Sequence, residues 1–322
     1  MTVYCSAKSY EKKLVVHNGA RLKYINLNAN GVQSIPYDIT SIFKSLTFAD
    51  TLVVLGVSGC IVLPFVKLIS KKKVIVNIDG LEWKREKWGS AAKWFLKYSE
   101  KLAVNYADEV VTDNRVIQEY VKSEYRKEST LIAYGADHVT KEKLSREIVS
   151  QYPFLSEKYA FKVCRIEPEN NIHIILEAFS EFGDLNLVII GNWENSEYGI
   201  KLKEKYLESK NIFLLDPIYD QQVLNQIRSN CYVYMHGHSA GGTNPSLVEA
   251  MYLELPIFAY GIQYNSETTQ NKAMYFDDKE ALLSLLTSID SESLGRVALD
   301  MKSIAVKEYT WGNITQKYSE LF

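Results

Sequence analysis

Long apolar segments, clustered cysteines and a strong net charge are all lacking in this chain of 322 residues. The most apolar stretch, from Cys60 to Ile69, is interrupted by Pro64 and Lys67 and has roughly half of the length that crosses a bilayer. The four cysteines form neither a Cys-x-x-Cys pair nor a cluster with histidines at metal-ligand spacing. A formal net charge of -2 gives no global basic field that would attract nucleic acid. These absences argue against a membrane-spanning protein, a metal cluster and a nucleic-acid-binding protein.

The N-terminus lacks the pattern of a signal peptide, because Met1 leads directly into Thr2-Val3-Tyr4-Cys5, which is typical of a β-strand. We therefore expect a cytoplasmic protein whose cysteines are buried free thiols. Apolar residues make up 47% of the chain, which is enough to bury one or two hydrophobic cores. We expect two domains.

Short β-rich runs alternate with longer helical patterns, which predicts an α/β fold with mainly parallel sheets. Strands are expected at residues 52–55, 73–77, 109–112, 129–133, 159–164, 186–191, 212–215, 232–236 and 256–260. In the second half, helices are expected to begin near Asn171, Tyr198, Asp220 and Pro245. Because ligands in such sheets bind beyond the carboxyl ends of the strands, the residues after each strand are the candidates for function.

The helix predicted from Ser90 to Tyr106 has an aromatic face and a basic face. Helical spacing brings together Trp94, Phe95, Tyr98, Leu102 and Tyr106, which we interpret as the side that faces the core. The basic side consists of Lys93, Lys97 and Lys101 and is interpreted as the outer surface.

A polar, lysine-rich stretch follows Tyr134-Gly135-Ala136-Asp137 and continues to about Ser156, after which the strand pattern restarts. We place the domain boundary in this stretch. Before it, Gly135 is expected to serve a turn and Asp137 to cap the segment that follows.

The first candidate site is Arg165-Ile166-Glu167-Pro168-Glu169-Asn170-Asn171, which follows a strand and opens a helix. A guanidinium at that place can fork onto a phosphate, while the helix N-terminus adds about half a positive charge. The alternative is a surface ion pair between Arg165 and Glu167 or Glu169.

The second candidate site begins in the loop after a predicted strand. Paired Gly241 and Gly242 let the backbone approach a ligand closely. Either Thr243 or Asn244 can cap the following helix, whose first N–H groups then face an anion.

The helix itself begins with Pro245, which suits the first helical position, and it has Glu249 one turn further along. A carboxylate there is an acceptor suited to the diol of a ribose. His236 and His238 share a strand face in the preceding segment, but no third ligand lies near them, so a metal site is not favoured.

The third candidate site, from Asn77 to Trp88, has carboxylates and tryptophans at the end of a strand. Sugars stack on aromatic rings and donate their hydroxyls to carboxylates, so Asp79, Glu82 and Trp83 are suited to a saccharide. The alternative is a solvated loop with its two tryptophans turned into the core.

Five segments of the sequence carry a family resemblance. Arg165 with Pro168-Glu169, the Pro245-Ser246-Leu247-Val248-Glu249-Ala250-Met251 helix and Tyr309-Thr310-Trp311-Gly312 resemble the retaining GT-B glycosyltransferases of family 4. Asn77-Ile78-Asp79-Gly80-Leu81-Glu82-Trp83-Lys84-Arg85 and Ile132-Ala133-Tyr134-Gly135-Ala136-Asp137 resemble the bacterial rhamnosyltransferase-type subgroup, which builds capsule and O-antigen repeat units. The resemblance covers essentially the whole chain.

The resemblance implies a GT-B fold, with two Rossmann-like domains that face a cleft. Residues 1–140 would be the acceptor-side domain, residues 141–305 the nucleotide-sugar-binding domain, and residues 306–322 a C-terminal helix that crosses back to the first domain. The family needs no metal or other cofactor, and the sequence has no Asp-x-Asp motif of the kind that metal-dependent enzymes of the GT-A fold show.

In the family, the residue that matches Arg165 binds the donor diphosphate, and the one that matches Glu249 binds the ribose. The backbone of Gly241, Gly242 and Thr243 would lie against the sugar and the phosphates. The donor-binding set that we expect also includes Asn170 and Asn244.

On the acceptor side, Asp79 and Glu82 are expected to orient the reacting sugars and to act in catalysis together with Arg165. We expect Trp83, Lys84 and Arg85 to contact the acceptor or the sugar.

Three departures from the family pattern stand out. Asn170 occupies the place of a Lys, and Gly241 occupies the place of a Glu eight residues before Glu249. Relatives also begin with a strand, a loop that contains Gly-Gly-Phe-Glu, and a helix, whereas this chain begins at what resembles their second strand. We therefore expect one βα unit to be missing from it.

The leading hypothesis is a retaining hexosyltransferase, with dTDP-rhamnose or another nucleoside-diphosphate hexose as donor and a polyprenyl-diphosphate-linked saccharide as acceptor. Two alternatives remain: a catalytically inactive, truncated relative, and a nucleotide-sugar epimerase.

A peripheral contact with the cytoplasmic face of the inner membrane is also expected, because basic residues and tryptophans alternate in the first half. The basic residues of this patch are Lys71, Lys72, Lys73, Lys84, Arg85, Lys87, Lys93, Lys97 and Lys101, and its tryptophans are Trp83, Trp88 and Trp94. A plain solvated face is the alternative, because Glu82, Glu86 and Glu100 dilute the charge.

Overall fold

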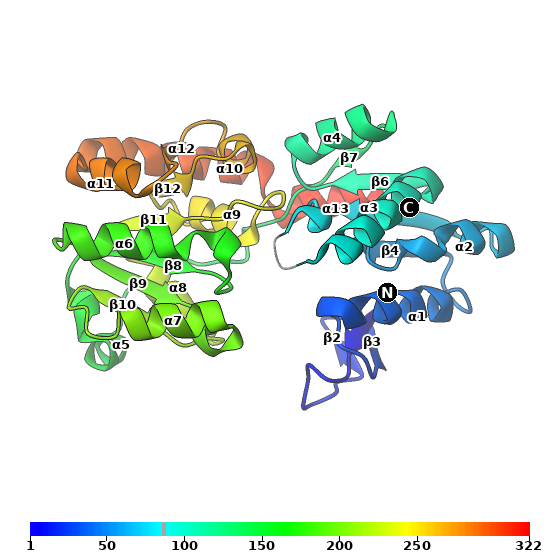
Figure 1. The fold of residues 1–322 in the computed structure, drawn as a ribbon, viewed down its shortest axis with the longest axis horizontal. Helices are drawn as coiled ribbons and strands as arrows, with labels where there is room; N and C mark the ends of the chain where they lie inside the picture. The colour runs from blue at the N-terminus through cyan, green and yellow to red at the C-terminus, as the bar shows by residue number, and fades with distance from the viewer. Residues whose placement is uncertain (86–87) are drawn as a thin grey trace. The chain divides into compact units, whose positions relative to one another are not determined.

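A computed structural model describes residues 1–85 and 88–322 of the chain (Figure 1). The chain divides into two compact units. The first consists of Met1–Ile132 with Glu320–Phe322, and the second of Ala133–Ser319. The division after Ile132 comes before residues 140 and 141, where the sequence analysis places the boundary.

Two separate sheets form the first unit, and almost all of their strand pairs are parallel. Its strands are β1 (Thr2–Ser6), β2 (Val16–His17), β3 (Ala20–Ile25), β4 (Thr51–Leu55), β5 (Lys73–Ile78), β6 (Glu109–Thr112) and β7 (Thr130–Leu131). Its helices are α1 (Ser34–Ser45), α2 (Leu63–Ile69), α3 (Ser90–Tyr106) and α4 (Arg115–Tyr125), with short 3-10 turns η1 (Gly31–Gln33), η2 (Cys60–Val62) and η3 (Glu82–Lys84). The strand orders are β1-β3-β2 and β4-β5-β6-β7, and only the β2–β3 pair is antiparallel.

One parallel sheet, with strand order β10-β9-β8-β11-β12-β13, forms the centre of the second unit. Its strands are β8 (Tyr159–Val163), β9 (Asn186–Ile190), β10 (Ile212–Leu215), β11 (Val233–His236), β12 (Ile257–Tyr260) and β13 (Met274–Phe276). Its helices are α5 (Arg146–Gln151), α6 (Ile172–Phe182), α7 (Glu197–Lys205), α8 (Gln221–Ser229), α9 (Pro245–Tyr252), α10 (Gln263–Thr268), α11 (Lys279–Thr287), α12 (Ser291–Glu308) and α13 (Trp311–Ser319), with 3-10 turns η4 (Pro153–Ser156), η5 (Pro168–Asn170) and η6 (Trp193–Asn195). Because the strand order reverses between β8 and β11, the carboxyl ends of these two strands define the crevice where such sheets bind ligands.

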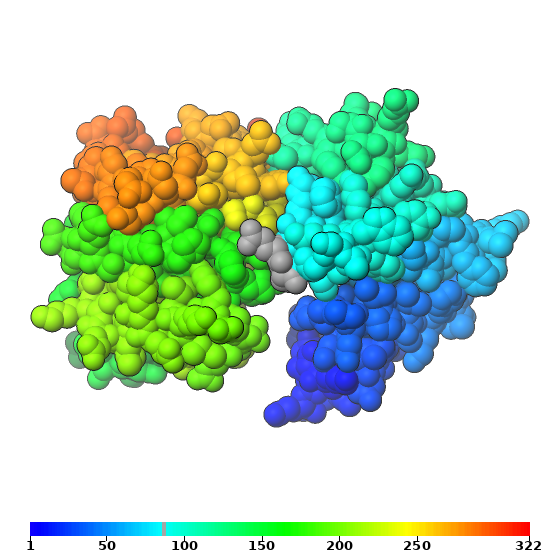
Figure 2. Space-filling model, in the orientation of Figure 1, coloured from blue at the N-terminus to red at the C-terminus, as the bar shows by residue number. Residues whose placement is uncertain are grey.

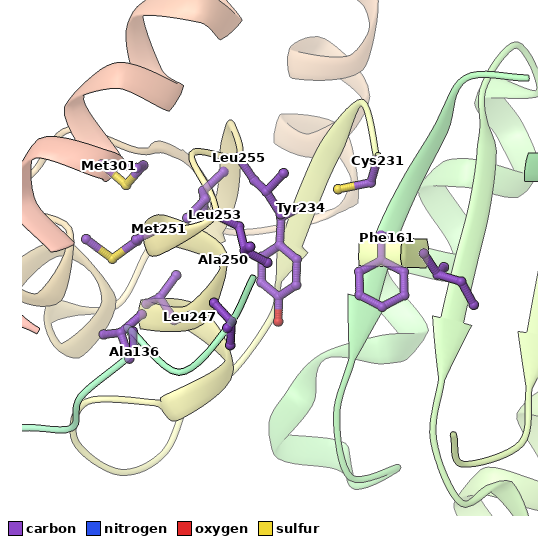
Figure 3. Close-up of a cluster of buried hydrophobic side chains, with 14 of the residues drawn as sticks. Ala136, Phe161, Cys231, Tyr234, Leu247, Ala250, Met251, Leu253, Leu255 and Met301 are labelled. Atoms are coloured by element: carbon purple, nitrogen blue, oxygen red, sulfur yellow. The ribbon is translucent and has the colours of Figure 1, made fainter. Parts of the chain in front are cut away.

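Two hydrophobic clusters cover opposite faces of this sheet, because successive strand residues point to opposite sides. On β8, Ala160 belongs to the cluster with α6, α7 and α11, whereas Phe161 belongs to the cluster with α8, α9 and α12. In the space-filling view, α6, α7 and α11 form much of the visible surface of this unit, coloured green to orange (Figure 2). On the other face, Tyr234 of β11 lies between Phe161 and the α9 residues Leu247 and Ala250 (Figure 3).

The strands and helices that the alternating pattern predicts are all present, with ends that differ by a few residues at most. The strands β2, β3 and β13 were not predicted. The predicted inner face of α3 is wrong: the side chain of Trp94 is 70% exposed and stacks on Tyr98, with 5.8 Å between ring centroids. The buried residues of this helix are Leu96, Ser99, Glu100, Ala103 and Val104.

Candidate functional site

A cavity of about 400 Å³ lies at the carboxyl ends of β8 and β11. Residues from four segments line it: the end of β8 with the loop after it, the loop after β11, one face of α8 along its length, and the first turns of α9. They are Val163, Cys164, Arg165, Asn170, Gln221, Leu224, Arg228, His238, Asn244, Pro245, Ser246 and Glu249. This β8–β11 cavity therefore brings together four of the predicted donor-binding residues, namely Arg165, Asn170, Asn244 and Glu249.

Hydrogen bonds of the Asn170 side chain join the loops after β8 and β11. Its side-chain amide donates to the Arg165 carbonyl oxygen at 2.9 Å, and its Oδ1 lies 3.2 Å from Nδ1 of His238. The Asn171 amide donates to the Gly237 carbonyl oxygen at 2.9 Å, and Ser239 N donates to the Glu169 carbonyl oxygen at 2.8 Å. Asn170 thus holds the shape of the cavity wall, in the place where the family has a cation.

The Arg165 side chain is 58% exposed at the edge of this cavity. Its Nη1 lies 4.0 Å from Oε1 of Glu167, which is the outer limit of an ion pair. The predicted surface pair with Glu167 therefore exists only in a loose form. Because an exposed pair of this kind contributes little, its guanidinium remains available to an anion.

The N-terminus of α9 forms a second wall of the cavity. Asn244 is its capping residue, because its Oδ1 accepts from Ser246 N at 3.0 Å and from Ser246 Oγ at 2.8 Å. Gly241 has a φ of 111°, which favours glycine, and a β-carbon there would lie 3.3 Å from Nε2 of His238. The predicted Gly241, Gly242 and Thr243 are buried beside the cavity but do not line it.

Glu249 is held by two donors in the structure. Its Oε2 accepts from Nη1 of Arg228, and its Oε1 lies 3.0 Å from Nε2 of His138. The Arg228 side chain is only 3% exposed, and its Nε and Nη2 donate to Oδ1 of Asn225 at 3.1 and 2.7 Å. Glu249, which was predicted to bind the ribose, is therefore the central acceptor of a hydrogen-bond network. The sequence did not predict this network.

The hydrogen bond from Trp311 fixes the protonation of His138. The indole N–H can only donate, and it donates to Nδ1 of His138 at 3.0 Å. Nδ1 is thus an acceptor, so the ring is neutral and its proton is assigned to Nε2, which donates to Glu249.

The segment before His138 is joined to the start of α13. Asp137 accepts from Trp311 N at 2.6 Å, and Ala136 N donates to the Tyr309 carbonyl oxygen at 2.7 Å. The prediction that Asp137 caps the segment after it is wrong, because it caps a helix 174 positions further along the chain. A β-carbon on Gly135 would lie 2.5 Å from Cδ2 of Trp311, so this glycine allows close packing.

Behind the cavity, two basic side chains are buried without a carboxylate partner among the described residues. Lys162 of β8 is 1% exposed, and burial lowers its pKa. His236 of β11 is 2% exposed; burial, and then Lys162 and His238, hold its pKa well below the usual range. In the part of the chain that the structure describes, no group of three or more His, Cys, Asp or Glu side chains is arranged to hold a metal ion.

In the first unit, Asp79 is exposed after β5, and its Oδ1 lies near Gly56. Asp38 of α1 is close enough to influence it: burial, and then the charge of Asp79, raise the pKa of Asp38 to about 7. A β-carbon on Gly59 would lie 2.5 Å from Cβ of Asp38, so glycine is required for α1 to approach this loop. The sequence analysis missed Asp38.

The other predicted acceptor-side residues interact with their own surroundings. Glu82 accepts from Nε of Arg85 and from Nε1 of Trp88, both at 2.9 Å. Trp83 donates to the fully buried Glu100 at 3.1 Å. Lys84 is exposed, with its Nζ 5.5 Å from the centre of the Trp83 ring. The Trp83 side chain is half-buried, with its indole N–H directed to Glu100.

Two residues of the β8–β11 cavity network, Arg228 and His138, were not predicted. A signal for Arg228 exists, because it follows Leu224 by four positions and so shares the apolar face of α8. A charged residue on such a face needs a buried partner. His138 comes directly after the segment that resembles the subgroup, and nothing in the sequence links it to Glu249.

Comparison with known families gives a description for each half of the chain. Residues 145–289 match the family of glycosyl transferases group 1. Residues 1–137 match a domain of unknown function, DUF1972. No curated protein sequence matches the chain significantly.

Solved structures share the fold at low sequence identity. Sucrose-phosphate synthase from Thermosynechococcus elongatus has a TM-score of 0.80 and 13% identity, over 99% of this chain and 87% of that chain. HepE of Anabaena in complex with UDP-glucose has a TM-score of 0.75 and 14% identity, over 94% of this chain and 85% of that chain. TarM of S. aureus in a complex that contains UDP has a TM-score of 0.64 and 14% identity, over 90% of this chain and 59% of that chain. The predicted two-domain α/β fold of the GT-B type is thereby confirmed.

Proposed function

We propose that this chain, whose residues 145–289 match the family of glycosyl transferases group 1, is a glycosyltransferase with the following reaction. The chain transfers a hexosyl group from a nucleoside-diphosphate sugar to a lipid-linked saccharide. The observation that supports this most is the β8–β11 cavity, which places an exposed arginine, a helix N-terminus and a carboxylate around one space of about 400 Å³. That volume is within the range of small-molecule sites.

Each wall of the cavity suits one part of the donor. Arg165 and the first N–H groups of α9 suit the diphosphate, because both offer donors and positive potential to an anion. Glu249 suits the hydroxyls of the nucleoside sugar. Asn170 and Asn244 keep these groups in place through the hydrogen bonds described above.

In the transfer, the bond between the anomeric carbon and the phosphate oxygen breaks, and the acceptor hydroxyl oxygen forms a new bond to that carbon. Negative charge grows on the departing diphosphate, where Arg165 and the N-terminus of α9 stabilise it. The acceptor hydroxyl attacks on the face from which the diphosphate leaves, so the departing phosphate oxygen can take its proton and the configuration at the anomeric carbon is retained. No metal ion is needed for these steps.

On the acceptor side, Asp79 is the better of the two predicted carboxylates for a sugar hydroxyl, because it is exposed. Glu82 is occupied by Arg85 and Trp88 and orients the loop. We propose Lys84 and Arg85 as contacts of the acceptor.

The finer identity of the substrates rests on the subgroup resemblance. It favours a rhamnosyl group from dTDP-rhamnose, a polyprenyl-diphosphate-linked acceptor and a role in capsule or O-antigen synthesis. We also propose a peripheral contact with an anionic membrane. Among the described residues, no helix is long and apolar enough to cross a bilayer.

Parts of the basic patch are already paired within the first unit. Lys97 lies 3.1 Å from Glu124, and Lys72 lies 3.6 Å from Asp50, whereas Trp94 is exposed. Lys87 lies outside the described residues. The protein should sediment with vesicles that contain anionic phosphatidylglycerol and leave them as salt rises. Equal binding to neutral phosphatidylcholine vesicles would remove the patch from the mechanism.

The central experiment compares Arg165→Ala with Arg296→Ala, in which another exposed arginine of the same unit, outside the cavity, is replaced. We expect Arg165→Ala to lower both donor affinity and transfer to a membrane-extracted lipid acceptor by at least tenfold, at unchanged melting temperature. Arg296→Ala should change neither. Wild-type affinity and turnover in Arg165→Ala would refute the assignment of the diphosphate site. Release of free nucleotide without any acceptor would indicate an epimerase instead.

A further inference from the structure

Both carboxylate oxygens of Glu249 already accept a hydrogen bond from the protein. We propose that Arg228 and His138 thereby set the nucleotide specificity of the β8–β11 cavity, so that it accepts 2′-deoxyribonucleoside diphosphates almost as well as ribonucleoside diphosphates. This inference rests on the proposed function, in which Glu249 faces the sugar of the nucleoside. Arg228 and His138 act through Glu249, so they are positioning residues.

Further hydrogen bonds fix the orientation of the two donors, Arg228 and His138. Arg228 is 2% exposed and is oriented by Asn225, which accepts from its Nε and Nη2. His138 is oriented by Trp311, whose N–H leaves the imidazole proton on the nitrogen that faces Glu249. Neither donor therefore has to turn away or lose another partner in order to hold Glu249.

An ionised carboxylate offers about four acceptor positions, two on each oxygen. In Glu249, Arg228 takes one position on Oε2 and His138 takes one on Oε1. One position on each oxygen remains for a ligand, which is enough for a 3′-hydroxyl alone or for a 2′,3′-diol.

The consequence concerns the analogue that lacks the 2′-hydroxyl. Sites that hydrogen-bond a substrate hydroxyl reject the analogue without it by about 10⁴-fold or more when a buried site group is then left unpaired. Here neither oxygen of Glu249 is left without a donor. Only one hydrogen bond is lost, and the Arg228 ion pair already balances the charge of the carboxylate, so this bond counts as a neutral one and its loss corresponds to a preference of about tenfold at most.

Three other polar side chains of the cavity, Asn244, Ser246 and Asn170, are already engaged in hydrogen bonds. Asn244 Oδ1 accepts both hydrogen bonds from Ser246, whose hydroxyl proton is thus already donated. Asn170 is likewise bonded through its amide group and its Oδ1. Compared with these three side chains, Glu249 is the one with acceptor positions left for a ribose hydroxyl.

The test compares UDP with 2′-deoxyuridine diphosphate, two nucleotides that differ in one hydroxyl. Titration calorimetry on the wild-type protein should give dissociation constants within about tenfold of each other. In His138→Phe, Oε1 of Glu249 loses its protein donor, so the hydrogen bond from the 2′-hydroxyl contributes more to affinity. The preference for UDP should therefore rise at least a further tenfold. The exposed fraction of the His138 side chain, 45%, makes this substitution compatible with folding.

The matched control is His173→Phe. His173 is also partly exposed, and its Nδ1 lies 3.0 Å from the Tyr198 hydroxyl, but it does not line the cavity. Its UDP preference should equal that of the wild type. Arg228→Lys, which keeps the charge but removes the fork of donors, should raise the preference in the same direction as His138→Phe.

The outcomes separate this inference from the proposed function. A wild-type preference for UDP well above tenfold overturns the inference and leaves the donor site intact. An unchanged preference in both His138→Phe and Arg228→Lys also overturns it. If the wild-type protein binds neither nucleotide, the proposed donor site itself is wrong, and the inference falls with it.

Discussion

Replacing Glu249 by glutamine should lower stability as well as nucleotide affinity. From the sequence alone, this change would be expected to affect only the ribose contact. In the structure, both partners of the carboxylate are donors: the Arg228 guanidinium and the Nε2–H of His138. A glutamine amide presents one oxygen and one NH₂ group, so in either orientation its NH₂ faces a donor.

The cost can be worked out from the two lost interactions. The charge-assisted bond to Arg228 becomes a neutral one, which removes about 1 kcal/mol. The bond to His138 is lost and leaves two donors facing each other at a site where the Glu249 side chain is 18% exposed, which adds about 1–2 kcal/mol. A total of about 2–3 kcal/mol corresponds to a fall in melting temperature of about 5–10 °C for a unit of this size.

Differential scanning calorimetry of Glu249→Gln would measure this fall, with the exposed, unpaired Glu204→Gln of α7 as control. Arg228 keeps its bonds to Asn225, so the variant should still fold. A melting temperature equal to that of the wild type would show that the network does not stabilise the second unit, and the protonation assigned to His138 would then be wrong.

Three further predictions concern other parts of the chain. Gly135→Ala should lower the melting temperature by several degrees, because the added methyl group meets the ring and the backbone nitrogen of Trp311; an unchanged value in calorimetry would contradict the packing. Because the pKa of Asp38 in the folded protein is raised to about 7, folding stability should fall as pH rises from about 4 to 7, and Asp38→Asn should raise the urea midpoint clearly more at pH 8 than at pH 5; equal gains at both would refute the raised pKa. Because burial lowers the pKa of Lys162, the unfolded chain holds its proton more tightly than the folded one, so stability should rise with pH. Lys162→Met should therefore raise the melting temperature more at pH 6 than at pH 9, and a lower melting temperature at pH 6 would show that the ammonium has a stabilising partner.

All strands of the second unit's sheet except β13 could be predicted from the sequence, because they are continuous apolar runs, as in sheets that are covered on both faces. The start of α9 could be predicted for a similar reason, since Asn244 and Pro245 act through local backbone geometry. Such signals need no knowledge of the tertiary structure.

Burial on α3 could not be predicted, because the size of the side chains was misleading. The helix packs through small residues such as Ala103 and Ser99, whose hydroxyl donates to the Val57 carbonyl oxygen at 2.6 Å. Its large aromatic residue Trp94 instead stacks on Tyr98 at the surface. Close approach of a helix to its neighbours, rather than hydrophobicity alone, decided which face turned inward.

The network around Glu249 was beyond the reach of the sequence for a different reason. His138 and Glu249 are 111 positions apart, and His138 and Trp311 are 173 positions apart. Only the folded second unit brings them together. Asn170 is a second example of an interaction that the sequence could not predict. From the sequence, its place in the family pattern indicated only the loss of a positive charge, whereas in the structure its side chain joins the loops after β8 and β11 by hydrogen bonds.

The bond from Trp311 to His138 also gives the protein a built-in optical reporter. The emission of an indole depends on whether its N–H has a partner and how polar that partner is, and this N–H is two hydrogen bonds away from the carboxylate that we place against the nucleoside. A variant that keeps Trp311 and has phenylalanine at the other four tryptophan positions would therefore signal occupancy of the cavity without any label. Donors and inhibitors could then be ranked by their fluorescence titration curves alone.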